Sequence, residues 1–151
     1  MNLYLVPVKR LRNFFLLILI ANIILSGITW FLLNSSVHLI PGYKAGDNLT
    51  NPLLISIVII AVVRGLQQRK HLINILSIRD FDARLARYEK FYKNRTTSYL
   101  LSVIASCLLC LFSQKSLFLY YAGLDVLLSL PFYPSAFLLK KELRTNDIIL
   151  Y

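Results

Sequence analysis

Four long apolar runs, free or nearly free of charge, alternate with polar and charged segments along this chain. A helix that crosses a membrane needs about 20 mainly apolar residues. The sequence therefore predicts an all-α integral membrane protein that forms a single domain, residues 1–151, with four transmembrane helices. Their expected positions are about residues 13–33, 52–66, 96–114 and 117–139.

The first run begins directly after three basic residues, Lys9, Arg10 and Arg12. A basic start followed by an apolar run is typical of a signal peptide. However, residues 13–37 are all uncharged, which is too long for the apolar part of such a peptide, and no small-residue cleavage site follows. We therefore expect a retained helix, preceded by a frayed or interfacial tail at residues 3–8.

The second run is the shortest, with 16 uncharged residues from Asn48 to Val63. Pro52 suits the first turn of a helix, where its missing N–H is not needed. Arg64 would complete the span by extending its charged end toward the lipid headgroups. We expect the helix to continue past Arg64 to about Leu76.

Residues 64–95 form the only long charged segment, with nine Lys or Arg and three acids. Ser77 and Asp80 have the spacing of a helix capping box, which predicts a turn at 77–79. Helices joined by so short a connection favour antiparallel neighbours. The sequence therefore predicts that the second and third transmembrane helices extend into a cytoplasmic antiparallel helical hairpin at about 64–95.

An apolar stripe supports the second helix of this hairpin. Its members are spaced by four, three and four residues: Phe81, Leu85, Tyr88 and Tyr92. The expected partner stripe before the turn consists of Leu66, Ile73 and Leu76. Two ion pairs, Asp80–Arg84 and Glu89–Lys93, would add support because the acid precedes the base by four residues. The alternative is that residues 81–92 lie flat on the inner leaflet, with their aromatic rings at the interface.

The distribution of basic residues predicts the orientation. With four spans, both termini and residues 64–95 share one side of the membrane, which then holds 15 of the 17 Lys and Arg residues. Lys and Arg prefer the cytoplasmic side. We therefore expect a multi-pass protein of a bacterial inner (plasma) membrane with both termini in the cytoplasm, and Lys44 and Lys115 on the outside.

The composition agrees with this assignment. The chain is 57% hydrophobic, above the roughly 45–50% apolar content of soluble domains. Its net charge of +10 would suggest nucleic acid in a soluble protein, but in this orientation all of it lies on the cytoplasmic side. We expect no nucleic-acid partner, and we expect attraction to anionic inner-leaflet lipids. The candidate lipid or partner contacts are Arg84, Arg87, Lys90 and Lys93.

Asp125 is the strongest candidate functional residue. An ionisable side chain inside a membrane span is costly, so it marks a functional site by default. A polar stripe at similar depth on the first helix could satisfy it: Asn22, Ser26 and Thr29. Tyr120 or Tyr121 on its own helix could do the same.

Pro131 and Pro134 would kink the fourth helix and free backbone carbonyls below Asp125, a combination that suits an ion or proton pathway. The spans offer no complementary base and no second acid. The alternative is therefore that Asp125 is protonated or hydrogen-bonded and holds the helices in register. A water-accessible cavity at Asp125 would favour transport, and a dry, packed bundle would favour the structural role.

Cys107 and Cys110 form a C-x-x-C pattern in the third span, which raises the hypothesis of a membrane thiol oxidoreductase. They lie toward a helix C-terminus, where the helix dipole disfavours a thiolate. The sequence has no second cysteine pair to pass electrons on. Apolar packing is the preferred interpretation of both residues.

The sequence contains no metalloprotease motif, no glycine-rich phosphate loop and no serine-hydrolase elbow. We therefore predict a non-enzymatic protein without catalytic residues, cofactor or metal. It would act as an accessory or scaffold subunit, through helix packing and its basic hairpin, in a homo-oligomer or a membrane complex. The second hypothesis is a small oligomeric transporter or channel with Asp125 as its ion or proton site.

Overall fold

The computed structural model of this chain describes residues 4–6, 8–35, 46–145 and 148–150. Within these ranges the chain is helical apart from short turns and one short pair of strands. The helices are Val8–Asn34 (α1), Asp47–Leu76 (α2), Phe81–Ser113 (α3), Leu117–Ser129 (α4) and Ala136–Leu143 (α5), with a 3-10 turn at Leu130–Phe132 (η1). The strands are Tyr4–Val6 (β1) and Ile148–Leu150 (β2).

The long helices are suited to a membrane. In the part of the chain that the structure describes, α1, α2 and α3 are long and apolar enough to cross a bilayer. The segment from α4 through α5 adds a fourth candidate if it is counted as one bent span. The prediction of a helical protein with several helices long and apolar enough to span a membrane is confirmed.

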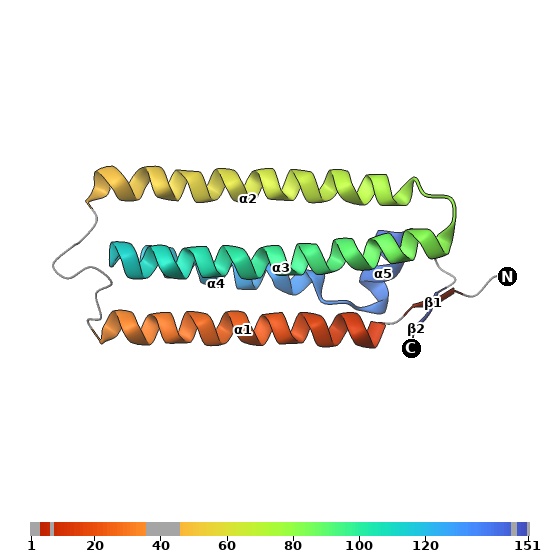
Figure 1. Ribbon diagram of the computed structural model, residues 1–151, viewed down its shortest axis with the longest axis horizontal. Coiled ribbons are helices and arrows are strands. Elements are labelled where there is room, and N and C mark those ends of the chain that lie inside the picture. Colours follow the sequence, from red (N-terminus) through yellow and green to blue (C-terminus); the bar gives the residue numbers. More distant parts are fainter. Residues whose placement is uncertain (1–3, 7, 36–45, 146–147, 151) are drawn as a thin grey trace.

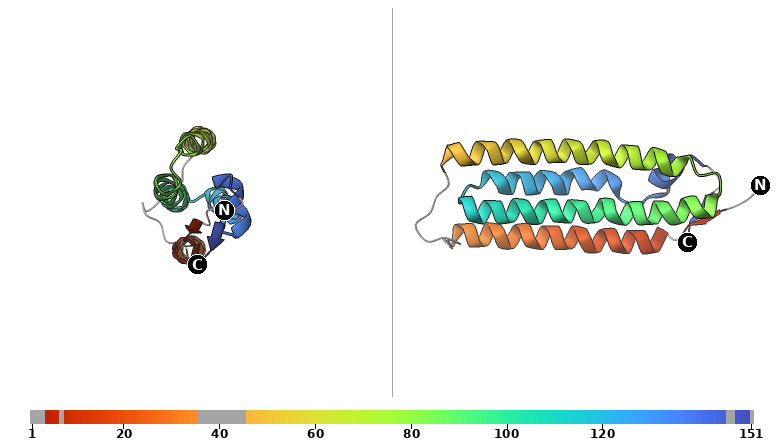
Figure 2. Two further views of the ribbon diagram at one scale, coloured as in Figure 1. Left: turned by 90° about the vertical axis from the view of Figure 1, so that its right-hand side faces the viewer. Right: turned by 45° about the horizontal axis from the view of Figure 1, so that its top comes forward.

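The helices form a bundle in which one member is peripheral. α1, α2 and α3 lie lengthwise beside one another, and α4 lies against α3 and α1 (Figure 1). α2 packs mainly on α3, and it stands at the edge of the bundle in the end-on view (Figure 2). The centre of the bundle therefore consists of α1, α3 and α4.

A short turn joins α2 to α3, and its capping differs from the expected one. Asp80 is the N-cap of α3, and its Oδ2 accepts a hydrogen bond from the Ala83 amide at 3.1 Å. Ser77 instead ends α2, and its hydroxyl donates to the Asn74 carbonyl at 2.7 Å. The predicted capping box is wrong because an N-cap has extended backbone, which Asp80 adopts (ψ 126°) and Ser77 does not (ψ −12°).

Arg84 also has other partners than predicted. Its Nε donates to the Ile78 carbonyl at 2.9 Å, so the guanidinium closes the turn that precedes α3. Among the described residues, neither Asp80–Arg84 nor Glu89–Lys93 forms the expected ion pair. Asp80 is exposed and the other three side chains are only half-buried, and ion pairs near the surface contribute little.

The predicted apolar stripe of α3 is present and buried. Phe81, Tyr88 and Tyr92 are buried, and Leu85 is partly buried against the same cluster. The cluster also contains residues from four other elements: Val6, Leu11, Phe15, Ile75, Leu139 and Leu143. The stripe therefore packs largely against α1 and α5, and α2 contributes only residues near its end, Ile75 and the partly buried Leu72.

The expected partner stripe on α2 is wrong. Leu66 and Ile73 are 63% and 57% exposed, and α2 contributes Ile75 and the partly buried Leu72 instead. The physical reason is the position of α5, which returns beneath α3 and covers the face that the sequence assigned to α2. A helix face cannot be matched to its neighbour from periodicity alone.

The two ends of the described chain meet. β1 and β2 pair in parallel, with Tyr4 opposite Ile148 and Val6 opposite Leu150. Val6 is fully buried. Residues 4–6 therefore form a paired strand rather than the frayed tail that was expected. Both ends lie at the end of the bundle that carries the turn between α2 and α3 (Figure 1).

The fourth apolar run is a broken helix. α4 has 13 residues and is about 20 Å long, short of the roughly 30 Å hydrocarbon core. η1 contains Pro131, the chain turns at Tyr133–Ser135, and the two helical parts differ in direction by 79°. The segment predicted as one kinked helix at 117–139 is divided into separate helices, and the break falls at the predicted prolines, which cannot continue helical hydrogen bonding.

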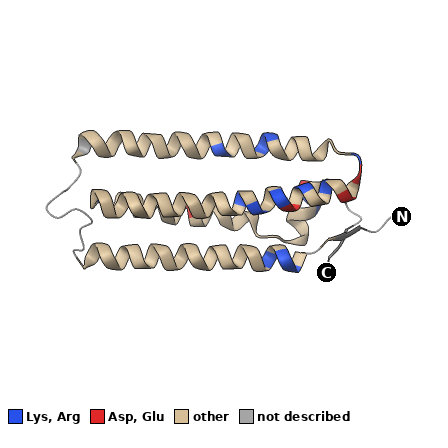
Figure 3. Cartoon of the chain, viewed as in Figure 1, with Lys and Arg blue, Asp and Glu red and all other residues tan. Residues whose placement is uncertain are grey.

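Charge is concentrated at one end of the bundle. Lys and Arg gather toward the end that holds the α2–α3 turn and both ends of the chain (Figure 3). The opposite half is almost free of charge. The predicted outer Lys44 lies outside the described residues.

Candidate functional site

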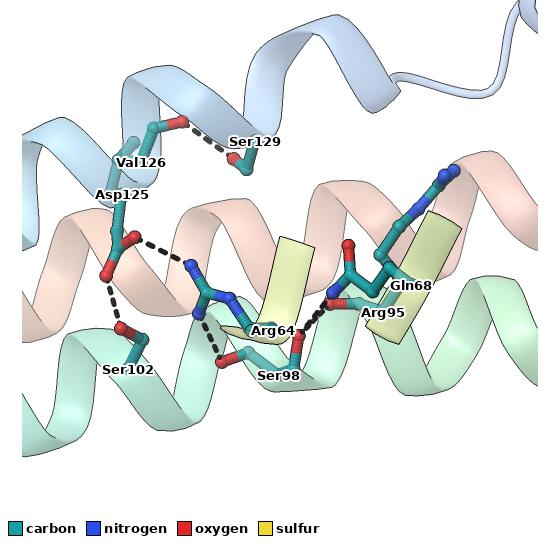
Figure 4. Close-up of polar contacts among 8 residues, drawn as sticks. All are labelled: Arg64, Gln68, Arg95, Ser98, Ser102, Asp125, Val126 and Ser129. Atoms are coloured by element: carbon teal, nitrogen blue, oxygen red, sulfur yellow. Dashed lines mark hydrogen bonds and ion pairs between the residues drawn. The ribbon is translucent and has the colours of Figure 1, made fainter. Parts of the chain in front are cut away.

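Asp125 lies inside the bundle with both carboxylate oxygens occupied. Its Oδ1 accepts a hydrogen bond from Arg64 Nη2 on α2 at 3.0 Å, which is also an ion pair. Its Oδ2 accepts from the Ser102 hydroxyl on α3. Asp125 is only 7% exposed. The carboxylate therefore joins α4 to both α2 and α3 (Figure 4).

Arg64 extends this contact along α3. Its Nη1 donates to the Ser98 carbonyl at 3.3 Å, and its guanidinium lies 4.5 Å from the centre of the Tyr99 ring. Gln68, one helical turn farther along α2, donates to the Ser98 hydroxyl at 3.2 Å. That hydroxyl in turn donates to the Arg95 carbonyl at 2.6 Å. We call Arg64, Gln68, Ser98, Ser102 and Asp125 the polar latch, because they attach α2 to the bundle.

The partner of Asp125 is not the one that the sequence suggested. The expected stripe on α1 does not contact it: Thr29 donates to the Leu25 carbonyl at 2.9 Å, and the buried Asn22 Oδ1 and Ser26 Oγ have no partner among the described residues. The complementary base is Arg64, which the sequence placed at the membrane boundary.

Two regular spacings could have indicated the latch. Arg64 and Gln68 are four residues apart on α2, and Ser98 and Ser102 are four residues apart on α3. Residues at this spacing share one helix face. The serines belong to a small-residue stripe typical of close helix packing, and the structure uses both of them as hydrogen-bonding groups.

A second buried ion pair lies beside the polar latch, nearer the α2–α3 turn. Arg95 on α3 donates to both carboxylate oxygens of Glu142 on α5, at 2.7 and 3.1 Å. Tyr88 donates its hydroxyl to the same carboxylate. The Arg95 guanidinium also lies 4.3 Å from the centre of the Phe132 ring, and Tyr92 donates to the Phe132 carbonyl at 2.8 Å. These contacts hold α5, and the η1 turn at which the fourth helix is broken, against α3.

A polar cleft of about 600 Å³ separates the charged halves of α2 and α3. α2 lines it with Arg64, Gln67, Gln68, His71, Asn74 and Ile75. α3 lines it with Arg87, Lys90, Phe91, Asn94, Arg95 and Ser98. The lining contains four Lys or Arg and no acid among the described residues. The cleft is therefore basic, and Arg64 connects it to Asp125.

The four bases predicted to contact lipid or a partner do not form one surface. Arg87 and Lys90 line the cleft. Arg84 faces another way, because its guanidinium contacts the Ile78 carbonyl at 2.9 Å and the Leu143 carbonyl at 3.5 Å. Lys93 is half-buried and does not line the cleft.

Cys107 and Cys110 are free thiols buried within the bundle. Cys107 belongs to a small apolar cluster with Val103 on α3 and Ala122 on α4. The positions of both cysteines accord with close packing between α3 and α4. The described residues contain no group of three or more His, Cys, Asp or Glu that could hold a metal ion.

Comparison with known proteins found no counterpart. None of the protein families, curated proteins or solved structures compared with this chain matches it. The function proposed for the protein therefore rests on the geometry of its own residues: the polar latch, the basic cleft and the exposed surface of α2.

Proposed function

We propose that this chain is a non-enzymatic accessory or scaffold subunit that presents α2 to another membrane protein or to a second copy of itself. It crosses the membrane four times, with both ends and the α2–α3 turn in the cytoplasm. The bent segment from α4 to α5 is its fourth passage. The charged ends of α2 and α3 form a basic hairpin that projects from the membrane.

The observation that carries this proposal is the exposure of α2. Only 6% of its most apolar segment is buried inside the molecule, against 39% for α3. Its contacts with the bundle include the polar latch, through Arg64 and Gln68, and Ile75 with the partly buried Leu72 near the turn. Lipid offers no hydrophobic reason for helices to associate, so membrane helices gain stability by packing against others. α2 has most of its surface free for such a neighbour.

The charge distribution and the chain ends support the orientation. The end of the bundle that carries the α2–α3 turn also carries most of the Lys and Arg residues (Figure 3), and positive charge favours the cytoplasm. The parallel pairing of β1 and β2 brings the two ends of the chain together. Paired ends must lie on the same side of the membrane, so the chain must cross it an even number of times. This favours counting the bent segment from α4 to α5 as a fourth span.

Photocrosslinking tests the role of α2. A photoreactive amino acid at Ile59 or Val62, both exposed on α2, should give a discrete protein adduct in native membranes. Ile24 on α1 and Leu108 on α3 are matched controls because they are equally apolar and exposed. These control positions should give no such adduct. Adducts of equal yield from all four positions, or none from α2, would contradict the proposal.

A second candidate function is a small oligomeric transporter or channel that uses Asp125. It is favoured by the position of Arg64, whose side chain both contacts Asp125 and lines the polar cleft. Movement of that one side chain would expose the acid to the cleft. Ion or proton flux in proteoliposomes that is lost in Asp125→Asn and retained in Arg69→Gln, with both variants folded, would support transport. Equal flux in both variants would exclude Asp125 as the ion site.

A further inference from the structure

The basic cleft between α2 and α3 has more positive charge than its surroundings neutralise. Arg64 is paired with Asp125 and Arg95 with Glu142. Arg87 and Lys90 also line the cleft, and the structure records no ion pair or hydrogen bond for their side chains among the described residues. Two uncompensated positive charges therefore face a cavity of about 600 Å³.

The other lining residues suit an anion with several oxygen atoms. His71, Asn74 and Asn94 line the same cleft and can donate hydrogen bonds. A phosphate group offers several acceptor oxygens and at least one negative charge, and Arg and Lys are its usual protein ligands. We propose that this cleft binds the phosphate of an anionic phospholipid headgroup, with Arg87 and Lys90 as its charged ligands.

The membrane-side end of the cleft, which is lined by Arg64, lies at the edge of the headgroup layer. Arg64 lies 17 residues after the start of α2, which is about 26 Å along the helix axis. The hydrocarbon core is about 30 Å thick, so Arg64 lies near its edge when α2 begins at the opposite edge. His71 lies seven residues farther, about 10 Å beyond Arg64 along the axis, which places it in the headgroup layer.

An apolar seam continues from the cleft into the membrane, which favours a lipid over a free phosphate compound. Ile60 and Val63 lie one helical turn before Arg64 and Gln67, on the same side of α2, and both are exposed. Leu101 follows Ser98 by three residues on α3 and is also exposed. Acyl chains can lie on this seam while the headgroup occupies the cleft. The site requires no protein partner and so goes beyond the proposed scaffold role.

Native mass spectrometry of the full chain in detergent tests the proposal. Phosphatidylglycerol should bind the wild-type chain at least tenfold more tightly than phosphatidylcholine with the same acyl chains. The double variant Arg87→Gln/Lys90→Gln should lose at least about tenfold of the phosphatidylglycerol affinity, because each charged hydrogen bond contributes roughly that factor. The variant Arg87→Lys should retain binding better than Arg87→Gln.

The matched control is Arg69→Gln/Lys70→Gln, which removes the same two residue types from exposed positions of α2 outside the cleft. It should bind phosphatidylglycerol like the wild type. Equal losses in the two double variants would overturn the proposal, because they would indicate unspecific attraction to charge. Binding of glycerol 3-phosphate or inorganic phosphate with the affinity of the lipid would overturn the lipid as the source of the phosphate.

Discussion

At the scale of single residues, Asp125 and Arg64 show how a membrane protein tolerates charge. Each would be costly alone in the interior, but together they neutralise each other, and Ser102 and Ser98 satisfy further hydrogen-bonding groups. A buried pair of this kind does not by itself add much stability, but removal of one partner leaves the other unpaired. The latch is thus better suited to fixing the position of α2 than to stabilising the bundle.

We expect Asp125→Asn to lower the free energy of unfolding in detergent by about 3 kcal/mol. This is the lower part of the range for breaking a buried ion pair, because Arg64 is partly accessible from the cleft. The double variant Arg64→Gln/Asp125→Asn should be more stable than the sum of the single effects predicts, by about 1–3 kcal/mol. Arg69→Gln is the control and should change stability by less than about 0.5 kcal/mol. Additive effects would refute the latch.

The Arg95–Glu142 pair makes a separate prediction. Glu142→Gln leaves the Arg95 guanidinium, only 4% exposed, without a counter-ion and should cost about 3–5 kcal/mol. Tyr88→Phe removes one hydrogen bond to the same carboxylate and should cost about 1 kcal/mol. Denaturant unfolding of both purified variants gives the comparison. The reverse order of these two losses would mean that Arg95 has another counter-charge.

At the scale of elements, mutation at the beginning of α3 can distinguish the cap seen in the structure, Asp80, from the cap predicted from the sequence, Ser77. Asp80→Ala should destabilise the protein by about 1 kcal/mol because it removes the cap of α3. Ser77→Ala should change the unfolding free energy by less than about 0.5 kcal/mol, since its hydroxyl is exposed and bonds only within α2. Thermal unfolding in detergent measures both. A larger loss of stability for Ser77→Ala than for Asp80→Ala would support the predicted capping box instead.

The apolar stripe of α3 shows what the spacing of apolar residues can predict and what it cannot. The spacing of Phe81, Leu85, Tyr88 and Tyr92 correctly identified the buried face of this helix. It carried no information about what covers that face, and the covering elements are mainly α1 and α5, with α2 contributing only near its end. α5 can take this place only because the chain turns by 79° at its prolines.

At the scale of the whole molecule, the arrangement predicts which segments share a side of the membrane. Ser77 is exposed at the turn between α2 and α3, and Ser35 is exposed at the opposite end of the bundle. A membrane-impermeant maleimide should label Ser35→Cys in intact cells and label Ser77→Cys only after permeabilisation. The wild type is the control, because Cys107 and Cys110 are buried. Labelling of Ser77→Cys in intact cells would reverse the proposed orientation.

The amino-acid sequence by itself determined the helical class with apolar helices long enough to span a membrane, the extent of α2 to Leu76, the place of the break near Pro131 and the need of Asp125 for a polar partner. These features depend on local properties: hydropathy, helix length, proline geometry and the cost of one charge in lipid. Only the tertiary structure decided that Arg64 is the partner of Asp125, that α5 covers the stripe of α3 and that Arg87 and Lys90 share a cleft with His71. These contacts depend on the rotation and depth of helices relative to one another, which no single segment encodes.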